Sequence, residues 1–223
     1  TQKPSSAASD VYKRQGLDNA DIERCADMLM LSGRPNPLIL ILLSLPNWLL
    51  PQQIKNFKET LRSKEFSKAF VEIMESEGSD FRTSDYPNSD PWRKAEIPAA
   101  NGHGTAAGIA KFFGILANDG QRDGKKLLSP EIIEQATTVR TSGPDLVLFQ
   151  APYKFGLGYM IDAPFSPIGM KEGMFGHTGI AGSAGFADLN NKVGFGFTNN
   201  RQHSLGKLYR TSNNLAKKLY EIL

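Results

Sequence analysis

The stretch Phe175-Gly-His-Thr-Gly-Ile-Ala-Gly-Ser-Ala-Gly-Phe-Ala-Asp188 leads into a second one, Val193-Gly-Phe-Gly-Phe-Thr-Asn-Asn-Arg201. Both are rich in glycine and in apolar residues, a composition bounded by turn signals that is typical of β-strands. We expect a first strand that ends in His-Thr-Gly, a second from Gly182 to Ala187 and a third from Val193 to Thr198. Asp188 to Asn191 form the predicted turn, because asparagine accepts the positive φ that turns need. Consecutive strands joined by short turns indicate an antiparallel sheet.

Signals that start and stop helices lie on both sides of these strands. Thr105 is placed to cap a helix that stops at Asn118-Asp-Gly120, and Ser129-Pro-Glu131 opens another helix. Tyr153 to Ile161 alternate like a further strand. An apolar stripe near the end of the chain predicts a long amphipathic helix, formed by Leu205, Leu208, Tyr209, Ser212, Leu215, Ala216, Leu219, Tyr220 and Leu223. The expected fold class is therefore α/β, of the α+β type, with an antiparallel β-sheet flanked by helices.

Residues 101–223 carry these signals, and residues 16–100 are expected to form a helical and irregular part of the same domain. Ile22 to Leu29 looks helical, with Cys25 as a small core residue, and Ile54 to Met74 has apolar residues at roughly helical spacing. The most apolar run extends from Leu38 to Leu50, but a proline interrupts it and it is shorter than the roughly 18 residues of a membrane span. We expect a buried helix or the wall of an apolar pocket there.

Residues 1–15 are expected not to belong to the native protein. Asp10-Val-Tyr-Lys-Arg-Gln15 matches one reading frame of a transposase-type sequencing adaptor, and the serines and alanines at positions 5–9 fit the rest of it. Such a fusion is excluded from fold reasoning. Without residues 1–15, the count of Lys and Arg falls from 26 to 23 and that of Asp and Glu from 23 to 22, so the net charge falls from +3 to +1. The charge therefore indicates no nucleic-acid partner.

The composition is that of an ordinary globular protein, with 40% hydrophobic and 22% charged residues. A single cysteine excludes an internal disulfide framework. The three histidines, His103, His177 and His203, stand far apart and without the neighbouring ligand pairs that metal sites show. We therefore expect neither a metal nor a cofactor.

The His-Thr-Gly strand has features that the wall of an acyl-transfer site requires. Such a site needs backbone N–H donors aimed at the developing oxyanion and a polar group that holds the substrate. Gly179 lets the backbone approach the substrate, Thr178 would offer a hydroxyl from the strand edge, and His177 would offer a donor that titrates near neutrality. The N–H of Ile180 is expected to donate to the oxyanion. Two further glycines are expected to keep this edge open, Gly182 and Gly185.

The whole glycine-rich stretch resembles the β-lactamase-related serine hydrolases, the family of class C β-lactamases, D-Ala-D-Ala carboxypeptidases and related esterases. Other stretches typical of that family are Ala95 to Ala106, Leu127 to Glu131 and Phe155 to Tyr159, so the resemblance covers Trp92 to Leu223. The family often has lysine where His177 stands. The resemblance implies a β-lactamase/transpeptidase-like fold and an acyl-enzyme cycle with a Ser-x-x-Lys nucleophile and a tyrosine base.

Neither the implied nucleophile nor the implied base has a match in the expected place. Ser204-Leu-Gly-Lys207 has the Ser-x-x-Lys pattern, but it follows the His-Thr-Gly strand, whereas the family order places the nucleophile before it. Tyr86-Pro-Asn88 imitates the tyrosine motif, yet it comes too late and is expected to be a turn. The other two histidines, His103 and His203, are expected to be surface or structural residues. We therefore interpret the chain as the C-terminal half of such a hydrolase, truncated before its catalytic serine, with no catalytic residue of its own and inactive alone.

Two other functions remain open at this stage. A family member without the nucleophile would use the His-Thr-Gly cleft to bind a ligand or peptide, as a binding or assembly protein. A membrane-associated structural protein would rest on the run Leu38 to Leu50 alone. For the leading hypothesis the expected partner is a small-molecule ester or amide, with no nucleic acid and no membrane span. Histidine in place of lysine favours an ester over a β-lactam, because a β-lactam carboxylate favours a permanent cation.

Overall fold

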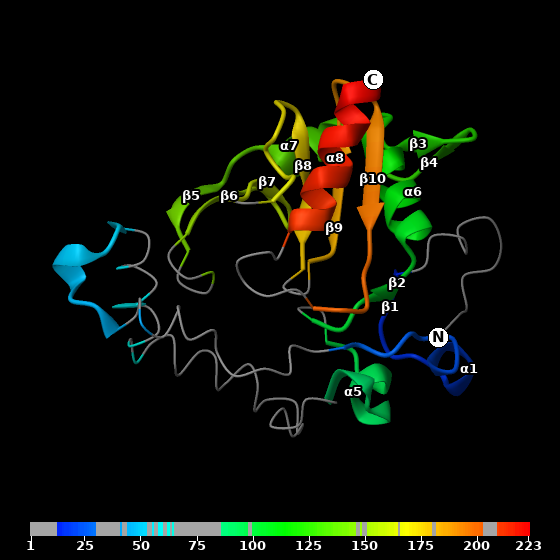
Figure 1. The fold of residues 1–223 in the computed structure, drawn as a ribbon. Helices are drawn as coiled ribbons and strands as arrows, with labels where there is room; N and C mark the ends of the chain where they lie inside the picture. Colours follow the sequence, from blue (N-terminus) through cyan, green and yellow to red (C-terminus); the bar gives the residue numbers. More distant parts are fainter. Residues whose placement is uncertain are drawn as a thin grey trace.

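The structure, a computed structural model, describes residues 13–29, 41, 44–52, 55, 58–59, 62, 64, 86–97, 100–145, 148, 151–164, 166–179, 182–202 and 209–223. Its largest sheet has six antiparallel strands in the order β10-β9-β8-β7-β6-β5, so each strand lies beside its neighbour in the sequence (Figure 1). The strands are β5 (Thr141–Pro144), β6 (Pro152–Phe155), β7 (Met160–Asp162), β8 (Met174–Thr178), β9 (Ala184–Asp188) and β10 (Val193–Phe197). The expected antiparallel sheet is confirmed.

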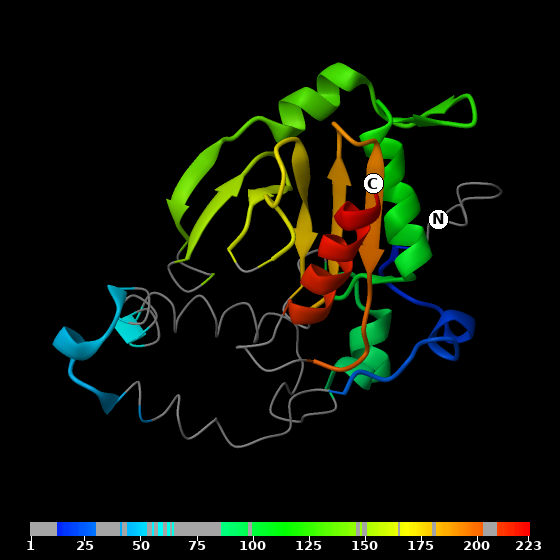
Figure 2. The same cartoon turned by 45° about the horizontal axis from the view of Figure 1, so that its top comes forward.

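Helices cover both faces of this sheet. α6 (Ala106–Ala117) and α7 (Pro130–Thr137) pack on one face and α8 (Arg210–Ile222) on the other. Figure 2 shows α8 in front of β9 and β10, with α6 on the other side of β10. The buried core on the α6 and α7 side consists of Phe113, Leu116, Ala117, Ile133, Phe175 and Ala187. The buried core on the α8 side consists of Met160, Ala163, Ile168, Met174, Phe186 and Ala216.

The alternation of side chains along a strand explains the Gly-Phe-Gly-Phe repeat of β10. Phe195 packs into the core on the α8 side, where its ring stacks on Phe186 of β9 with a centroid distance of 4.7 Å. Gly194 and Gly196 face α6 instead. A Cβ atom on Gly194 would lie 2.0 Å from the Gly114 nitrogen, and one on Gly196 would lie 2.4 Å from an α6 carbonyl oxygen. These glycines therefore let the helix lie directly on the strand.

α6 and α7 begin at the residues that the sequence predicts. The Gly108 N–H donates to the Thr105 hydroxyl at 3.0 Å, and the Ile132 N–H donates to the Ser129 hydroxyl at 3.3 Å. Each bond satisfies a donor that the first turn of a helix leaves unpaired. α6 ends before Gly120, which has a φ of 73°. The predicted caps and the predicted stop are thus confirmed.

The segment from Tyr153 to Ile161, expected as one strand, forms two. β6 and β7 lie on either side of residues 156–159, where the chain reverses with Gly158 at a φ of 77°. Gly156 lies against α7, because a Cβ atom there would be 2.1 Å from the Ala136 carbonyl oxygen. The apolar pattern continues through the reversal, so periodicity alone does not distinguish one long strand from a short hairpin.

The turn between β9 and β10 differs from the expected one in its backbone. The positive φ falls on Lys192, at 56°, and not on an asparagine. Asn190 and Asn191 donate their backbone N–H groups to the Asp188 carboxylate at 2.9 and 3.0 Å. An aspartate that accepts the following N–H groups fixes a turn locally, so the left-handed residue comes after the two asparagines.

Smaller elements lie outside the large sheet. They are β1 (Lys13–Arg14), α1 (Asn19–Ile22), the 3-10 helices η1 (Asn47–Leu49) and η2 (Tyr86–Asn88), α5 (Asp90–Lys94), β2 (His103–Gly104), β3 (Gln121–Arg122) and β4 (Lys125–Lys126). β1 pairs with β2, and β3 pairs with β4 around a hairpin at residues 123–124. That residues 1–15 are foreign to the protein stays a prediction.

The helix expected from Ile22 to Leu29 is wrong. α1 ends at Ile22, and Leu29 forms an isolated bridge to the segment that follows β10: its N–H donates to the Asn200 carbonyl at 2.6 Å, and its own carbonyl accepts from the Gln202 N–H at 3.0 Å. This backbone pairing with a distant segment replaces the helical hydrogen bonds. Cys25 is half-buried rather than a core residue, and its thiol donates to a carbonyl oxygen of α1.

The apolar run from Leu38 to Leu50 is only partly described. Ile41, Trp48 and Leu49 are exposed, whereas Leu50 is buried, so the expected burial is not found at most of these positions. In the described part of the chain, no helix is long and apolar enough to cross a bilayer. The helix expected from Ile54 to Met74 lies largely outside the described residues.

Candidate functional site

The His-Thr-Gly tripeptide begins within the last residues of β8, where no described strand pairs with one side of the strand. β8 pairs with β9 over its whole length. On its other side it pairs with β7 only at Gly176, opposite Met160. Within the residues that the structure describes, no strand covers this side of β8 beyond Gly176. An extended ligand can lie against such an edge and use its backbone groups.

His177 points to the same face as Phe175, but it lies beyond the core and its side chain is exposed. Its Nδ1 lies 2.8 Å from the Thr178 carbonyl oxygen. Because a carbonyl oxygen only accepts, Nδ1 carries the proton in this arrangement, and Nε2 of the neutral ring is an acceptor. In the cationic ring Nε2 is a donor as well. The side chain can therefore receive or give a proton at Nε2.

The sequence led us to expect the Thr178 hydroxyl at the strand edge, and this expectation is wrong. Its side chain is buried, with 7% of the residue exposed. Its hydroxyl donates to the Met160 sulfur at 3.5 Å. The alternation along β8 turns Thr178 to the α8 side of the sheet, opposite His177. The tripeptide thus directs its histidine outward and its threonine into the protein.

A tight turn follows the tripeptide. The Gly179 N–H donates to the Ser183 carbonyl at 2.9 Å, and the Gly182 N–H donates to the Gly179 carbonyl at 2.9 Å. Gly182 has a φ of 103°, which favours glycine. A Cβ atom on Gly179 would lie 2.5 Å from the Ser183 Oγ, so glycine leaves room for that hydroxyl. Ile180, the expected oxyanion donor, lies outside the described residues.

Gly185 serves the packing of α6 and does not open the strand edge. A Cβ atom there would lie 2.4 Å from the ring of Phe113 and 2.6 Å from Ile109. This position of β9 faces the helix, because alternate residues of a strand point to opposite faces of the sheet. The expectation that Gly185 keeps the substrate edge open is therefore wrong.

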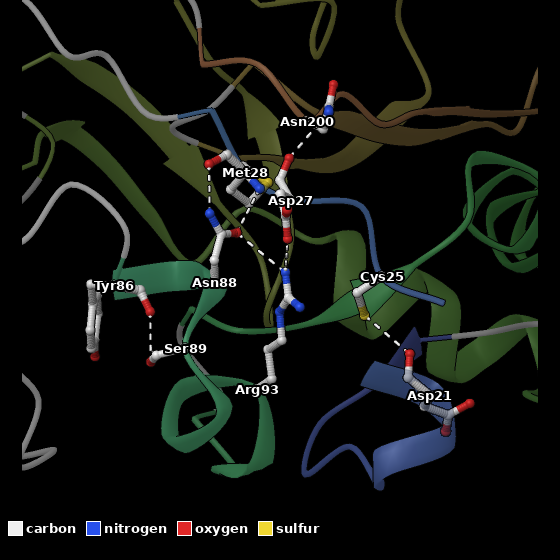
Figure 3. Close-up of polar contacts among 9 residues, drawn as sticks. All are labelled: Asp21, Cys25, Asp27, Met28, Tyr86, Asn88, Ser89, Arg93 and Asn200. Carbon is white, nitrogen blue, oxygen red and sulfur yellow. Dashed lines mark hydrogen bonds and ion pairs between the residues drawn. The ribbon is translucent and has the colours of Figure 1, made fainter. Parts of the chain in front are cut away.

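Asn88, the last residue of the Tyr-Pro-Asn sequence, belongs to a polar network that joins distant segments (Figure 3). Its Oδ1 accepts from the Met28 N–H at 2.7 Å, and its Nδ2 donates to the Met28 carbonyl at 3.0 Å. The buried Arg93 donates to the Asp27 carboxylate at 2.9 Å, and Asn200 donates to the Asp27 carbonyl at 3.1 Å. The partners stand 60 to 173 residues apart, so no local pattern could have predicted the network.

Tyr86 lies at the start of η2, and its contacts are structural. Its ring packs on Trp92 with a centroid distance of 4.5 Å, and its carbonyl oxygen accepts from the Ser89 hydroxyl at 2.8 Å. Ser89 in turn caps α5. The expected turn at Tyr86-Pro-Asn88 is thus a 3-10 helix that leads into α5. The hydrogen bonds of Asn88 and Arg93 tie the start of α5 to residues 27–28.

The remaining sequence candidates add no reactive group to the described site. Burial lowers the pKa of the half-buried His103, which favours the neutral ring of a structural residue. His203, Ser204 and Lys207 lie outside the described residues. In the part of the chain that the structure describes, no group of three His, Cys, Asp or Glu residues could hold a metal ion.

The fold and the His-Thr-Gly strand agree with a match to a known family. The family model described as Beta-lactamase matches residues 62–217. The chain therefore belongs to the β-lactamase family, a family of β-lactamase-like serine hydrolases and esterases. Over 112 residues it is 41% identical to the Esterase/beta-lactamase LipL of Mycobacterium tuberculosis (strain ATCC 25618 / H37Rv), a match that covers 50% of this chain and 25% of LipL.

Solved structures of the same kind share the fold. A penicillin-binding protein homologue from Caulobacter crescentus is 28% identical, with a TM-score of 0.57, over 86% of this chain and 43% of its own. A family VIII carboxylesterase is 30% identical, with a TM-score of 0.52, over 60% of this chain and 37% of its own. EstA from Arthrobacter nitroguajacolicus Rue61a, at 21% identity and a TM-score of 0.58, is similar over 95% of this chain and 51% of its own. The chain spans about half the length of these relatives or less.

Proposed function

We propose that the chain is the C-terminal part of a serine hydrolase that cleaves esters through an acyl-serine intermediate. The observation that carries the proposal is the end of β8, where the exposed His177 and the turn at Gly179 to Gly182 lie beside a strand edge that no described strand pairs with. Membership of the family supports the reaction class. The His-Thr-Gly strand would be the wall along which the substrate lies.

The proposed reaction has two steps. A serine oxygen attacks the ester carbonyl carbon, the alcohol leaves with a proton, and water then cleaves the acyl-serine to a carboxylic acid and free serine. The serine and its base would come from a part of the protein outside these 223 residues. The Ile180 N–H would donate to the oxyanion that forms in each step. Gly179 would let the substrate approach the backbone, and His177 in its cationic form would donate from Nε2 to a substrate oxygen.

An ester substrate is favoured over a β-lactam by the residue at position 177. A β-lactam carries a carboxylate, which a permanent cation such as lysine holds better than a histidine whose charge depends on pH. The ring of His177 is arranged to be an acceptor at Nε2 when it is neutral. The family VIII enzyme is named a carboxylesterase, which supports the same substrate class. LipL is named for both esterase and β-lactamase activity and does not separate the two.

The function is tested with two variants of His177 in the full-length protein. We expect His177→Ala to lower kcat/KM for p-nitrophenyl butyrate about 100-fold, because a donor aimed at the developing charge is lost. We expect His177→Lys to raise the rate of nitrocefin hydrolysis, relative to that of the ester, about tenfold, because it adds a fixed charge for the carboxylate. Lys154→Ala, which removes an exposed cation from β6, is the control.

Two results would count against this function. If the esterase activity of His177→Ala stays within twofold of the wild-type value, His177 has no role in the reaction. A full-length protein that binds esters but turns over neither substrate would favour the non-catalytic binding protein.

A further inference from the structure

The residue that precedes β9 places a hydroxyl on the face of the sheet to which His177 points. His177 stands opposite Gly185 in the pairing of β8 with β9, and a Cβ atom on Gly185 would meet side chains of α6. The Gly179 N–H donates to the Ser183 carbonyl at 2.9 Å, which continues this pairing toward the turn. Since alternate residues of a strand share a face, Gly179 and Ser183 lie on the α6 side of the sheet, as His177 does.

The position of the Ser183 hydroxyl follows independently from Gly179. A Cβ atom on Gly179 would lie 2.5 Å from the Ser183 Oγ and 3.8 Å from the Ser183 Cβ. The hydroxyl therefore stands in the space that a side chain at position 179 would fill. Ser183 is only half-buried, so a ligand that lies along the end of β8 can reach it.

His177 and Ser183 are the polar side chains that the described part of this face carries beyond the core. His177 follows the buried Phe175 on the same face and is exposed, and the two glycines, Gly179 and Gly185, add no side chain between them. His177 and Ser183 are diagonal neighbours across the strand pair, a relation in which residues lie about 7–8 Å apart. A substrate held by His177 would thus meet the Ser183 hydroxyl a few bonds further along.

The chemistry of a serine hydroxyl indicates what it would bind. The group donates one hydrogen bond and also accepts, and it carries no charge, so it suits a neutral polar group. A site that hydrogen-bonds a substrate hydroxyl discriminates against the analogue without that hydroxyl, because the polar group of the protein then loses its partner. An ester with a further hydroxyl beside the ester group would satisfy Ser183 better than a plain alkyl ester.

We propose that Ser183 is a substrate-binding residue that sets the specificity of this site: its hydroxyl, held beside Gly179 on the His177 side of the sheet, selects esters that carry a hydroxyl group next to the ester group. Ser183 forms only a hydrogen bond to the substrate in this role. The inference rests on the proposed function, because it names the substrate class of the same site.

The specificity is tested in the full-length protein with a set of related esters. Ethyl butyrate is the parent, ethyl 3-hydroxybutyrate has the hydroxyl in the acyl part, and 2-hydroxyethyl butyrate has it in the alcohol part. We expect kcat/KM for one of the hydroxylated esters to exceed that for the parent about tenfold, as for one well-placed hydrogen bond. The two hydroxylated esters distinguish which part of the substrate Ser183 contacts.

Removal of the hydroxyl should remove the preference. We expect Ser183→Ala to lower kcat/KM for the preferred ester about tenfold, so that it loses its advantage over ethyl butyrate. The loss should appear as a higher KM, because the hydrogen bond is made to the bound substrate and to the transition state alike. Ser142→Ala is the matched control, since this exposed serine lies on β5 at the other edge of the sheet. It should leave the preference within twofold of the wild-type value.

A second variant turns the hydroxyl away without deleting it. Gly179→Ala places a methyl group 2.5 Å from the Ser183 Oγ, a contact that the serine relieves by rotating to another rotamer. We expect this variant to lose the preference as well. In a Ser183→Ala background the Oγ is gone, so Gly179→Ala should leave the ratio of the kcat/KM values unchanged. A ratio that falls by the same factor in both backgrounds would overturn the proposal.

Other outcomes separate this proposal from the function on which it rests. Equal kcat/KM values for all the esters in the wild-type protein would overturn the role of Ser183 and leave the esterase function in place. A preference that survives Ser183→Ala would do the same. A folded full-length protein that hydrolyses none of the esters would overturn the proposed function, and the role of Ser183 with it.

Discussion

Gly194→Ala is expected to destabilise the chain by about 3 kcal/mol or more, because overpacking at a rigid contact forces whole elements apart. A Cβ atom at Gly194 would lie 2.0 Å from the nitrogen and 2.4 Å from the Cα of Gly114, and 2.5 Å from the Ala110 carbonyl oxygen. All three are backbone atoms of α6, so no side-chain rotation relieves the clash. The helix would have to leave β10, and with it the core around Phe113.

The same contact offers a matched control from the other side. A Cβ atom on Gly114 would lie 4.0 Å from the Gly194 Cα, which is ordinary contact. Gly114→Ala should therefore be neutral or stabilise α6 by up to about 1 kcal/mol, through the better helix propensity of alanine. Urea unfolding followed by circular dichroism measures both variants. A Gly194→Ala variant as stable as the wild type, or a Gly114→Ala variant that fails to fold, would contradict this packing.

Asp188→Ala should cost about 3 kcal/mol, because it removes the buried acceptor shared by a tyrosine hydroxyl, an asparagine side chain and two N–H groups of the turn. Asp188 is fully buried at the end of β9. Its carboxylate accepts from the Tyr220 hydroxyl at 2.5 Å and from the Asn191 side chain at 2.8 Å, besides the N–H groups of the turn. Glu221→Ala is the control on the same helix: its exposed pair with Lys218 should be worth at most about 0.5 kcal/mol. Equal effects of the two variants would contradict this role.

The bond between Asp188 and Tyr220 also predicts a pH dependence. Burial alone would raise the pKa of Asp188, but the bonds from Tyr220, Asn191 and the turn outweigh it, so the net pKa is lowered. Its stabilising contribution should be complete above about pH 4, the unfolded value, and be lost as the pH falls through the lower folded pKa.

Tyr220 sets the alkaline limit. Burial and the Asp188 carboxylate raise its pKa, so its contribution is complete below about pH 10 and is lost as the pH rises further. The free energy of unfolding that Tyr220→Phe removes should therefore be largest near pH 7 and smaller at both extremes. A difference that is constant from pH 3 to pH 11 would contradict the assignment.

Much of the fold follows from local signals in the sequence. The caps at Thr105 and Ser129 and the stop at Gly120 lie where short-range hydrogen bonds decide the helix ends. The three strands from β8 to β10 were predicted to within about two residues, because glycine and aromatic residues fit only a few local conformations. The hairpin of β3 and β4 was missed although Asp123-Gly124 is a strong turn signal.

The parts that sequence did not reveal depend on distant contacts. Thr178 is buried because its position in β8 turns it to the α8 side of the sheet, where it contacts Met160 of β7. The bridge between Leu29 and Arg201, which follows β10, overrides a helical pattern at residues 22–29. Gly185 was assigned to the substrate edge, but α6 decides its role. Each of these depends on which face or which partner a residue meets, and periodicity alone does not specify that.

The most direct test of the proposed function is to find the serine that forms the acyl-enzyme. The full-length protein would be treated with a fluorophosphonate, its mass measured, and the labelled peptide identified by tandem mass spectrometry. We predict one adduct, on a serine of a Ser-x-x-Lys sequence. That sequence would lie upstream of Gly16 in the full-length protein, outside these 223 residues. An adduct on Ser183, Ser204 or any other serine of residues 16–223 would contradict the account, and so would a folded full-length protein that takes up no label.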